Sequence, residues 1–271
     1  MRRLVIVALI FSMVLSGCQS SFIRPTKMST ERTSIAFKEW VVPNFFISKQ
    51  IRVVGLGDSL TQGVGDEFKK EGYFGRLTTE MFEWKGVKNV KTDNLAKRGS
   101  RSEQLNKKLE DPDVKSTVKK ADVILITIGG NDLMKVVKKN FFNLKKDPFY
   151  DELQRFETNL DELYGTIRGL NSDAIIVVAG LYNPLSLVTD EANDFEDIII
   201  EWNKAIEART IIDSKSCFVP VTDLFDSNTA MVYHTDFFHP NANGYNSMTK
   251  RFMEKIKSCD LQKLSDGELD M

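Results

Sequence analysis

The sequence predicts an α/β fold in which a mostly parallel five-stranded sheet carries helices on both faces. Apolar, β-branched runs such as residues 121–128 have the composition of buried parallel strands. Segments with helical spacing alternate with these runs, and glycines and polar residues follow each run. The 271 residues show no internal repeat, so we expect one folded domain over residues 49–260.

The predicted elements alternate along the chain. Strands are expected at residues 51–56, 87–95, 121–128, 174–179 and 217–221. Helices are expected at residues 73–84, 100–109, 148–170, 190–212 and 241–256. The helix at 190–212 has one apolar face, formed by Phe195, Ile198, Ile199, Trp202 and Ile206. Residues 261–271 are an acidic tail, whose end from Ser265 onward we expect to fray.

The amino-terminal residues 1–17 have the pattern of a signal peptide. Arg2 and Arg3 precede an apolar run at residues 4–15, which is shorter than the roughly 20 residues of a spanning helix. Residues 15–18 read Leu-Ser-Gly-Cys, which resembles the lipobox of bacterial lipoproteins. The resemblance implies a lipid anchor at Cys18 and a mature chain on the extracytoplasmic face of the cell membrane. The alternative is an ordinary signal peptide that has a cysteine beside it.

Residues 18–48 would then tether the domain to the membrane. Their first half is rich in serine and threonine and predicts a flexible linker. Phe37, Trp40, Phe45 and Phe46 are expected to pack on the domain near its start, or alternatively to contact the bilayer surface.

Cys217 and Cys259 have two interpretations. They could form one disulfide in an exported protein, or they could be small buried apolar residues. We adopt the second interpretation and expect no bridge.

The net charge and the glycine pattern argue against nucleic acids and dinucleotides as ligands. The formal net charge of −1 provides no basic field for nucleic acid. Residues 55–60 begin like a dinucleotide-binding turn, but they lack its third glycine, and Asp58 stands where a pyrophosphate would lie.

Chemistry-bearing residues follow the predicted strands, at the sheet edge where α/β proteins form their sites. Ser59 follows the first strand and is a candidate nucleophile. The chain has two histidines, and Asp236 precedes His239 by three residues, a spacing that lets the carboxylate orient the imidazole in a tight turn. We therefore assign His239 as the base and His234 as a bystander at the rim of the site.

Oxyanion donors are expected after three strands. The candidates are the backbone N–H groups of Ser59 and Gly99 and the side-chain amide of Asn131. The alternative role for Asn131 and Asp132 is a helix cap, which Asp132 can still provide.

These motifs together resemble the SGNH, or GDSL-type, esterase and lipase family, over residues 51–256. Residues 57–60 read Gly-Asp-Ser-Leu, Gly99 matches the second block, residues 129–132 read Gly-Gly-Asn-Asp, and residues 236–239 read Asp-Phe-Phe-His. The resemblance, in particular to lipoprotein members of bacterial envelopes, implies a flavodoxin-like three-layer α/β/α fold. It also implies hydrolysis of an ester through an acyl-serine by a monomer that uses no metal or other cofactor. Lys97 and Arg98 depart from the family pattern and would favour acidic or phosphate-bearing substrates.

The substrate and two alternatives stay open at this stage. The ester could belong to a lipid or to an acylated glycan, and the enzyme could be a deacetylase or an acyltransferase. A surface binding lipoprotein without activity is the non-enzymatic alternative. Loops at residues 134–149 and 182–190 are expected to build the acyl pocket, where Phe141, Phe142 and Phe149 could form a lid or simply belong to the core.

Overall fold

The computed structural model describes residues 42–140, 145–183, 192–227 and 231–271. In this part of the chain, five strands form one sheet in the order β2-β1-β3-β4-β5, and every neighbouring pair is parallel. The strands are β1 (Lys49–Gly57), β2 (Val87–Asn94), β3 (Val123–Thr127), β4 (Ile175–Ala179) and β5 (Ser216–Val219). The predicted sheet is confirmed, and no strand end differs from its prediction by more than two residues.

Alternation of side chains along the central strands creates two separate cores. On β3, Ile124 and Ile126 point to one face, whereas Val123 and Leu125 point to the other. All five residues of β3 and all five of β4 are buried. This double burial explains why these strands read as continuous apolar runs in the sequence.

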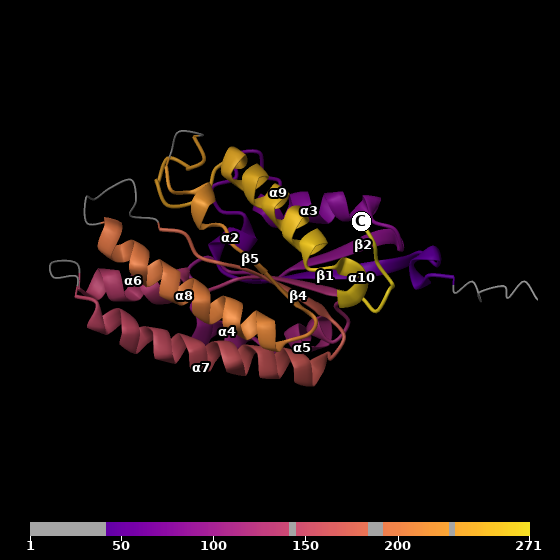
Figure 1. Cartoon of the computed structure of the whole chain (residues 1–271), viewed down its shortest axis with the longest axis horizontal. Helices are drawn as coiled ribbons and strands as arrows, with labels where there is room; N and C mark the ends of the chain where they lie inside the picture. The colour runs from indigo at the N-terminus through magenta and orange to yellow at the C-terminus, as the bar shows by residue number, and fades with distance from the viewer. Residues whose placement is uncertain (1–41, 141–144, 184–191, 228–230) are drawn as a thin grey trace, which may run out of the picture. The chain divides into compact units, whose positions relative to one another are not determined.

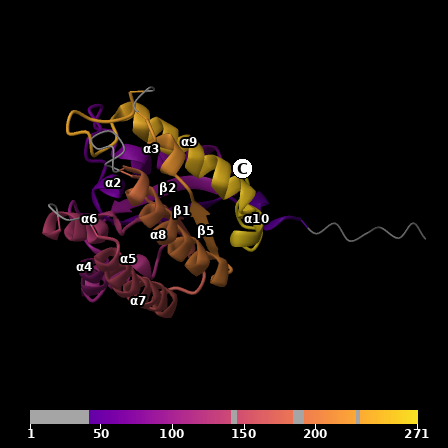
Figure 2. The same cartoon turned by 60° about the vertical axis from the view of Figure 1, so that its left-hand side comes forward.

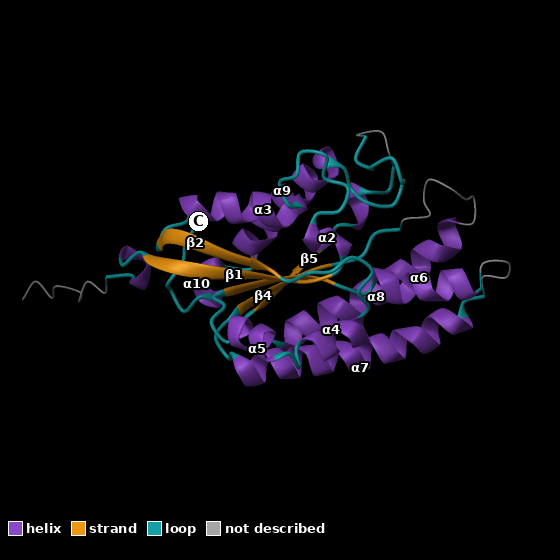
Figure 3. Ribbon diagram, turned by 180° about the vertical axis from the view of Figure 1, so that it is seen from behind, coloured by secondary structure: helices purple, strands orange, loops and turns teal. Residues whose placement is uncertain are grey.

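Helices cover both faces of the sheet and give the expected three layers (Figures 1 and 3). One layer contains α3 (Gly72–Glu80), α9 (Ala242–Ser258) and α10 (Leu261–Leu264). The other layer contains α4 (Ser102–Lys108), α5 (Pro112–Val118), α6 (Gly130–Lys139), α7 (Asp147–Leu170) and α8 (Ala192–Ile212). The rotated view in Figure 2 shows the same separation. A short helix, α2 (Ser59–Gln62), follows β1, and three 3-10 turns occupy Asn44–Phe46, Met81–Glu83 and Thr222–Leu224.

The segment expected as a loop at residues 134–149 is largely helical. Its first part belongs to α6, because Leu133, Val136 and Val137 form a buried stripe at helical spacing. Phe149 lies on α7 and packs edge-on against Phe195 of α8, with ring centroids 5.6 Å apart. Phe149 is therefore a core residue, whereas Phe141 and Phe142 lie outside the described residues, as does most of the predicted loop 182–190.

The acidic end of the chain is not frayed, so that prediction was wrong. Leu261, Leu264 and Leu269 are buried against the core beneath α9. Lys85 and Asp270 exchange both backbone hydrogen bonds, at 2.8 and 3.1 Å, and their side chains form an ion pair at 2.7 Å. Leucines spaced among the acidic residues provide the burial that a freely solvated tail lacks.

The expectation that Cys217 and Cys259 stay unpaired was also wrong. They form a disulfide with their Cα atoms 6.0 Å apart. Cys217 lies on β5 and Cys259 caps the end of α9, which runs back over that strand. The bridge therefore depends on where α9 ends in space, which residue spacing does not encode.

The aromatic residues expected to pack on the domain near its start do so in part. Phe45 is half-buried beneath Lys85, whose Nζ lies 5.8 Å from the ring centroid, whereas Phe46 remains 70% exposed. Phe37, Trp40, Cys18 and the signal sequence lie outside the described residues. Within the described ranges, no helix combines the length and apolarity needed to cross a membrane.

Candidate active site

Ser59 stands on a sharp turn between β1 and α2. Gly57 has φ of 111°, and a Cβ atom there would lie 1.9 Å from the carbonyl oxygen of Thr127, so only glycine fits. The N–H of Asp58 donates to that same carbonyl over 3.0 Å. The turn places Ser59 at the first residue of α2, buried to 4% exposure at the carboxyl edge of the sheet.

A network of buried polar side chains holds this turn in place. Asp58 Oδ1 accepts hydrogen bonds from the N–H of Leu60 at 3.0 Å and from Thr127 Oγ1 at 2.6 Å. The hydroxyls of Thr127 and Thr61 lie 2.8 Å apart, and the Thr61 hydroxyl lies 2.7 Å from that of Tyr73. Burial raises the pKa of Asp58 to about 6, although these hydrogen bonds act to lower it.

The predicted base and acid lie in line with Ser59. His239 Nε2 is 2.9 Å from Ser59 Oγ, and His239 Nδ1 is 2.6 Å from Asp236 Oδ2. Burial acts to raise the pKa of Asp236, but hydrogen bonds from the backbone N–H and imidazole of His239 and from the backbone N–H of Phe238 lower it to about 2. The acid is therefore a carboxylate at neutral pH, as a group that orients an imidazolium must be.

A compact loop holds this pair. The N–H of His234 donates to the carbonyl of His239 over 2.8 Å, and Tyr182 Oη donates to the carbonyl of Phe238 over 2.6 Å. Asn241 closes the loop by donating to the carbonyl of Tyr233, while its Oδ1 caps α9.

His234 lies at the rim. Its Nδ1 is 3.8 Å from Asp236 Oδ1, its side chain is 38% exposed, and it does not line the pocket around Ser59.

The predicted oxyanion donors face Ser59 across a pocket of about 360 Å³. Gly99 has φ of 80°, and Asn131 lies in the first turn of α6. Asn131 Nδ2 donates one hydrogen to the carbonyl of Ser100 at 3.1 Å, which leaves its second hydrogen for a ligand. Among the described residues, those that line the pocket are Ser59, Arg98, Gly99, Asn131, Met134, Lys138, Asp236, Phe238 and His239.

Asp132 has a role that the sequence did not reveal. It caps α4 rather than its own helix, because its carboxylate accepts the N–H of Ser102 at 3.1 Å and the Ser102 hydroxyl at 2.6 Å. Asn159 on α7 donates to that hydroxyl over 2.9 Å. The contacts tie the loop that carries Gly99 to the helix that carries Asn131.

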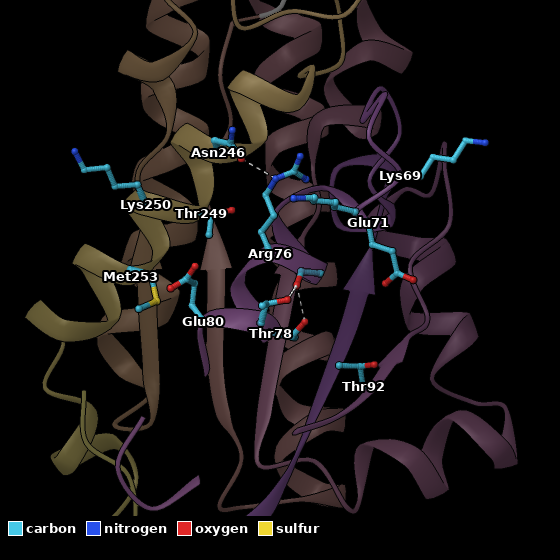
Figure 4. A pocket seen from close by; sticks show the side chains of 13 residues that line it. Lys69, Glu71, Arg76, Thr78, Glu80, Thr92, Asn246, Thr249, Lys250 and Met253 are labelled. Carbon is cyan, nitrogen blue, oxygen red and sulfur yellow. Dashed lines mark hydrogen bonds between the residues drawn. The ribbon is translucent and has the colours of Figure 1, made fainter. Parts of the chain in front are cut away.

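A larger cavity of about 870 Å³ lies elsewhere, between α3 and α9 (Figure 4). Arg76 crosses it, donating to Asn246 Oδ1 at 2.7 Å and pairing with Asp66 at 2.6 Å. No nucleophile–base pair lines this cavity in the described part of the chain. Cavity size alone would therefore have indicated the wrong site.

Comparison with known proteins agrees with the geometry. Residues 56–246 match the GDSL-like Lipase/Acylhydrolase family. The chain belongs to this family. With its serine, histidine and aspartate in hydrogen-bonded order, this member is a serine ester hydrolase.

Two Bacillus proteins are similar in sequence. The uncharacterized protein YpmR of Bacillus subtilis is 36% identical over 217 residues, covering 79% of this chain and 85% of that protein. The spore germination lipase LipC of Bacillus licheniformis is 26% identical over 210 residues, covering 74% of this chain and 94% of that protein.

Solved structures share the fold. The lipase Lip_vut3 from a goat rumen metagenome superposes with a TM-score of 0.67 at 25% identity, covering 79% of this chain and 99% of that one. An acetyl-xylooligosaccharide esterase of Geobacillus, Axe2, superposes with a TM-score of 0.59 at 18% identity, covering 78% and 96%.

Proposed function

We propose that the protein is a lipid-anchored ester hydrolase of the cell envelope that acts through an acyl-Ser59 intermediate. One observation carries the proposal: Ser59, His239 and Asp236 form a hydrogen-bonded row in a pocket that Gly99 and Asn131 also line. A binding protein without activity has no need of this combination of nucleophile, base, acid and donors.

The mechanism has two halves. His239 Nε2 takes the proton of Ser59 Oγ as that oxygen bonds to the ester carbonyl carbon, and Asp236 stabilises the imidazolium. The N–H groups of Ser59 and Gly99 and the amide of Asn131 bind the oxyanion. The C–O bond to the alcohol then breaks, and His239 returns the proton to the leaving alkoxide. Water repeats the sequence on the acyl-serine and releases the acid.

The envelope location rests on different observations. Residues 1–17 have the signal pattern, and Cys18 follows the small residues of a lipobox. The disulfide between Cys217 and Cys259 is the kind of bond that persists in oxidising compartments outside the cytoplasm. Wild-type protein should incorporate radiolabelled palmitate whereas a Cys18→Ala variant should not, and equal incorporation by both would refute lipid anchoring at Cys18.

The class of ester follows from the pocket. Its volume of about 360 Å³ is at the small end for ligand sites, and its apolar walls are Met134 and Phe238. These walls suit a short acyl chain on a lipid or a glycan. Removal of acetyl groups from a glycan is the second candidate, supported by the same small pocket and by the fold shared with the acetyl-xylooligosaccharide esterase.

Active-site labelling tests the proposal. A fluorophosphonate probe should label the wild-type protein and fail to label Ser59→Ala and His239→Ala variants. The wild type should also cleave p-nitrophenyl esters, with a preference for short chains in a series from acetate to palmitate. Undiminished hydrolysis by Ser59→Ala protein would refute Ser59 as the nucleophile. Acetylated glycans assayed beside the series separate the two substrate candidates.

A further inference from the structure

Two cationic side chains enter the catalytic pocket. Arg98 comes from the loop after β2, whose backbone is fixed by a hydrogen bond from the Arg98 N–H to Gln62 Oε1 at 2.6 Å. Lys138 lies seven residues after Asn131 on α6, with Met134 between them on the same helix face. Both cations are exposed, and no carboxylate of the described residues forms an ion pair with either.

Further cations extend from this pocket in two directions. Two neighbouring hollows of about 460 Å³ each meet the catalytic pocket at Gly99. Among the described residues, the three hollows together are lined by eight cationic side chains and two acidic ones. The cations are Lys97, Arg98, Arg101, Lys107, Lys108, Lys135, Lys138 and Lys139.

The two acids offset only two of these eight positive charges. Asp236 is bound by His239, and Asp111 Oδ1 accepts the N–H groups of Asp113 and Val114 at the start of α5. Lys135 is the cation among the eight with a carboxylate partner, Glu152 at 2.8 Å, in the described part of the chain.

The positive charge is local. The whole chain has a formal net charge of −1, so eight cations around one site are a departure from its average. The larger cavity in Figure 4 differs, because Glu71 and Glu80 lie among its cations and Asp66 binds Arg76.

We propose that the ester cleaved by Ser59 carries a phosphate group close to the scissile bond, and that Arg98 and Lys138 bind this phosphate. The inference rests on the proposed function. A phosphate has several acceptor oxygens, so a guanidinium and an ammonium that line the same pocket can bind it together. A neutral ester uses neither cation. The remaining cations raise the local concentration of such an anion by long-range attraction.

The test compares esters that differ by the phosphate alone. Monobutyrylglycerol is paired with its 3-phosphate, and acetylglucose is paired with its 6-phosphate. The full-length protein is assayed in neutral detergent at low salt. We expect kcat/KM to be roughly tenfold higher for the phosphorylated member of at least one pair, at the low end of electrostatic steering effects. The preference should fall towards one in 0.5 M NaCl, because salt screens exposed charges.

Two double variants with the same change in charge test whether Arg98 and Lys138 cause the preference for the phosphorylated ester. Arg98→Gln/Lys138→Gln should remove the preference for the phosphorylated ester. Lys69→Gln/Lys250→Gln makes the same charge change in the cavity of Figure 4 and should retain that preference. The scaffold with the stronger preference identifies the source of the phosphate as a lipid headgroup or a sugar.

The outcomes separate this inference from the proposed function. A wild-type protein that cleaves neutral and phosphorylated esters equally overturns the phosphate inference and leaves the esterase proposal standing. A preference that survives in Arg98→Gln/Lys138→Gln also overturns the inference. Wild-type protein that cleaves neither member of any pair and is not labelled by a fluorophosphonate overturns both.

Discussion

Asn131 is the residue whose contribution to the reaction is most open to measurement. One hydrogen of its amide is fixed by the Ser100 carbonyl, and Asn131 lines the pocket with its second hydrogen still available to a ligand. Asn131→Ala should lower kcat by about 10²–10³ with a small change in KM, because the donor acts on charge that develops in the transition state. Asn140→Ala, at the other end of α6, is the control and should keep its kcat. A loss of less than about threefold in Asn131→Ala would contradict the assignment.

Asp58 makes stability depend on pH. Its pKa is raised by burial from 3.8 to about 6. Between these two pH values the folded state keeps the Asp58 proton, whereas the unfolded chain releases it. This contribution to stability is present in full below about pH 4 and is lost as pH rises through about 6. Relative to wild type, Asp58→Asn should therefore gain on the order of 3 kcal/mol in free energy of unfolding between pH 4 and pH 8. Urea denaturation at pH 4, 6 and 8 measures this difference, and parallel pH profiles for the two proteins would contradict it.

The hydrogen-bonded row of Ser59, His239 and Asp236, our proposed catalytic residues, was predictable because its chemistry restricts the choice of residues. Two histidines are present, and one of them has an aspartate three residues before it. Asp132 shows the limit of this reasoning. Its partner Ser102 lies 30 residues away, and only the folded chain shows that the carboxylate caps a different helix.

At the scale of elements, the contact between α4, α6 and α7 holds Gly99 and Asn131, the proposed oxyanion donors. Ser102→Ala removes the hydroxyl that joins Asp132 and Asn159. We expect a loss of about 1–3 kcal/mol in the free energy of unfolding, because the buried Asp132 and the half-buried Asn159 each lose a partner. We also expect kcat to fall by roughly tenfold to a hundredfold, because the loop that carries Gly99 is no longer fixed relative to Asn131 on α6.

Denaturation and steady-state kinetics on the same preparations test this pair of effects. Ser247→Ala makes the same change on the exposed side of α9, where the hydroxyl donates to the carbonyl of Asn243, and should leave both quantities near wild type. A Ser102→Ala protein that loses stability but keeps its full kcat would show that the contact does not position the donors.

Strands were easier to predict than helices for a physical reason. A central parallel strand is buried on both faces and leaves a continuous apolar signal, as β3 and β4 do. Helices α5 and α6 are short, and each buries only a few residues, so their polar faces resemble loops. Asp111 and Pro112 form a start signal for α5 that could have been used, since an Asp cap followed by Pro is typical of a first turn.

At the scale of the whole molecule, the disulfide closes a segment of the chain that includes Asp236 and His239. A cross-link between residues 42 apart should stabilise the fold by about 2–4 kcal/mol, mainly by restricting the unfolded chain. Cys217→Ala/Cys259→Ala should lose this amount in guanidinium denaturation. Dithiothreitol should reproduce the loss in wild type and have no effect on the double variant, and an unchanged wild-type midpoint under reduction would argue against the bridge.

Two of the wrong predictions, the unpaired cysteines and the frayed end, have one cause. Both concern where the last helices return to the sheet, and this depends on the packing of α9 across β5 rather than on any local pattern. The acidic composition of residues 261–271 predicted a solvated tail, although the leucines of this segment are buried and its backbone pairs with Lys85.

The direction of β1 separates the point where the described chain enters the domain from the candidate site. The strand begins at Lys49, near the start of the described chain, and delivers Ser59 just beyond its far end. Nine residues of strand separate these points by about 30 Å. The described chain therefore enters the domain at the edge of the sheet opposite the one that carries Ser59.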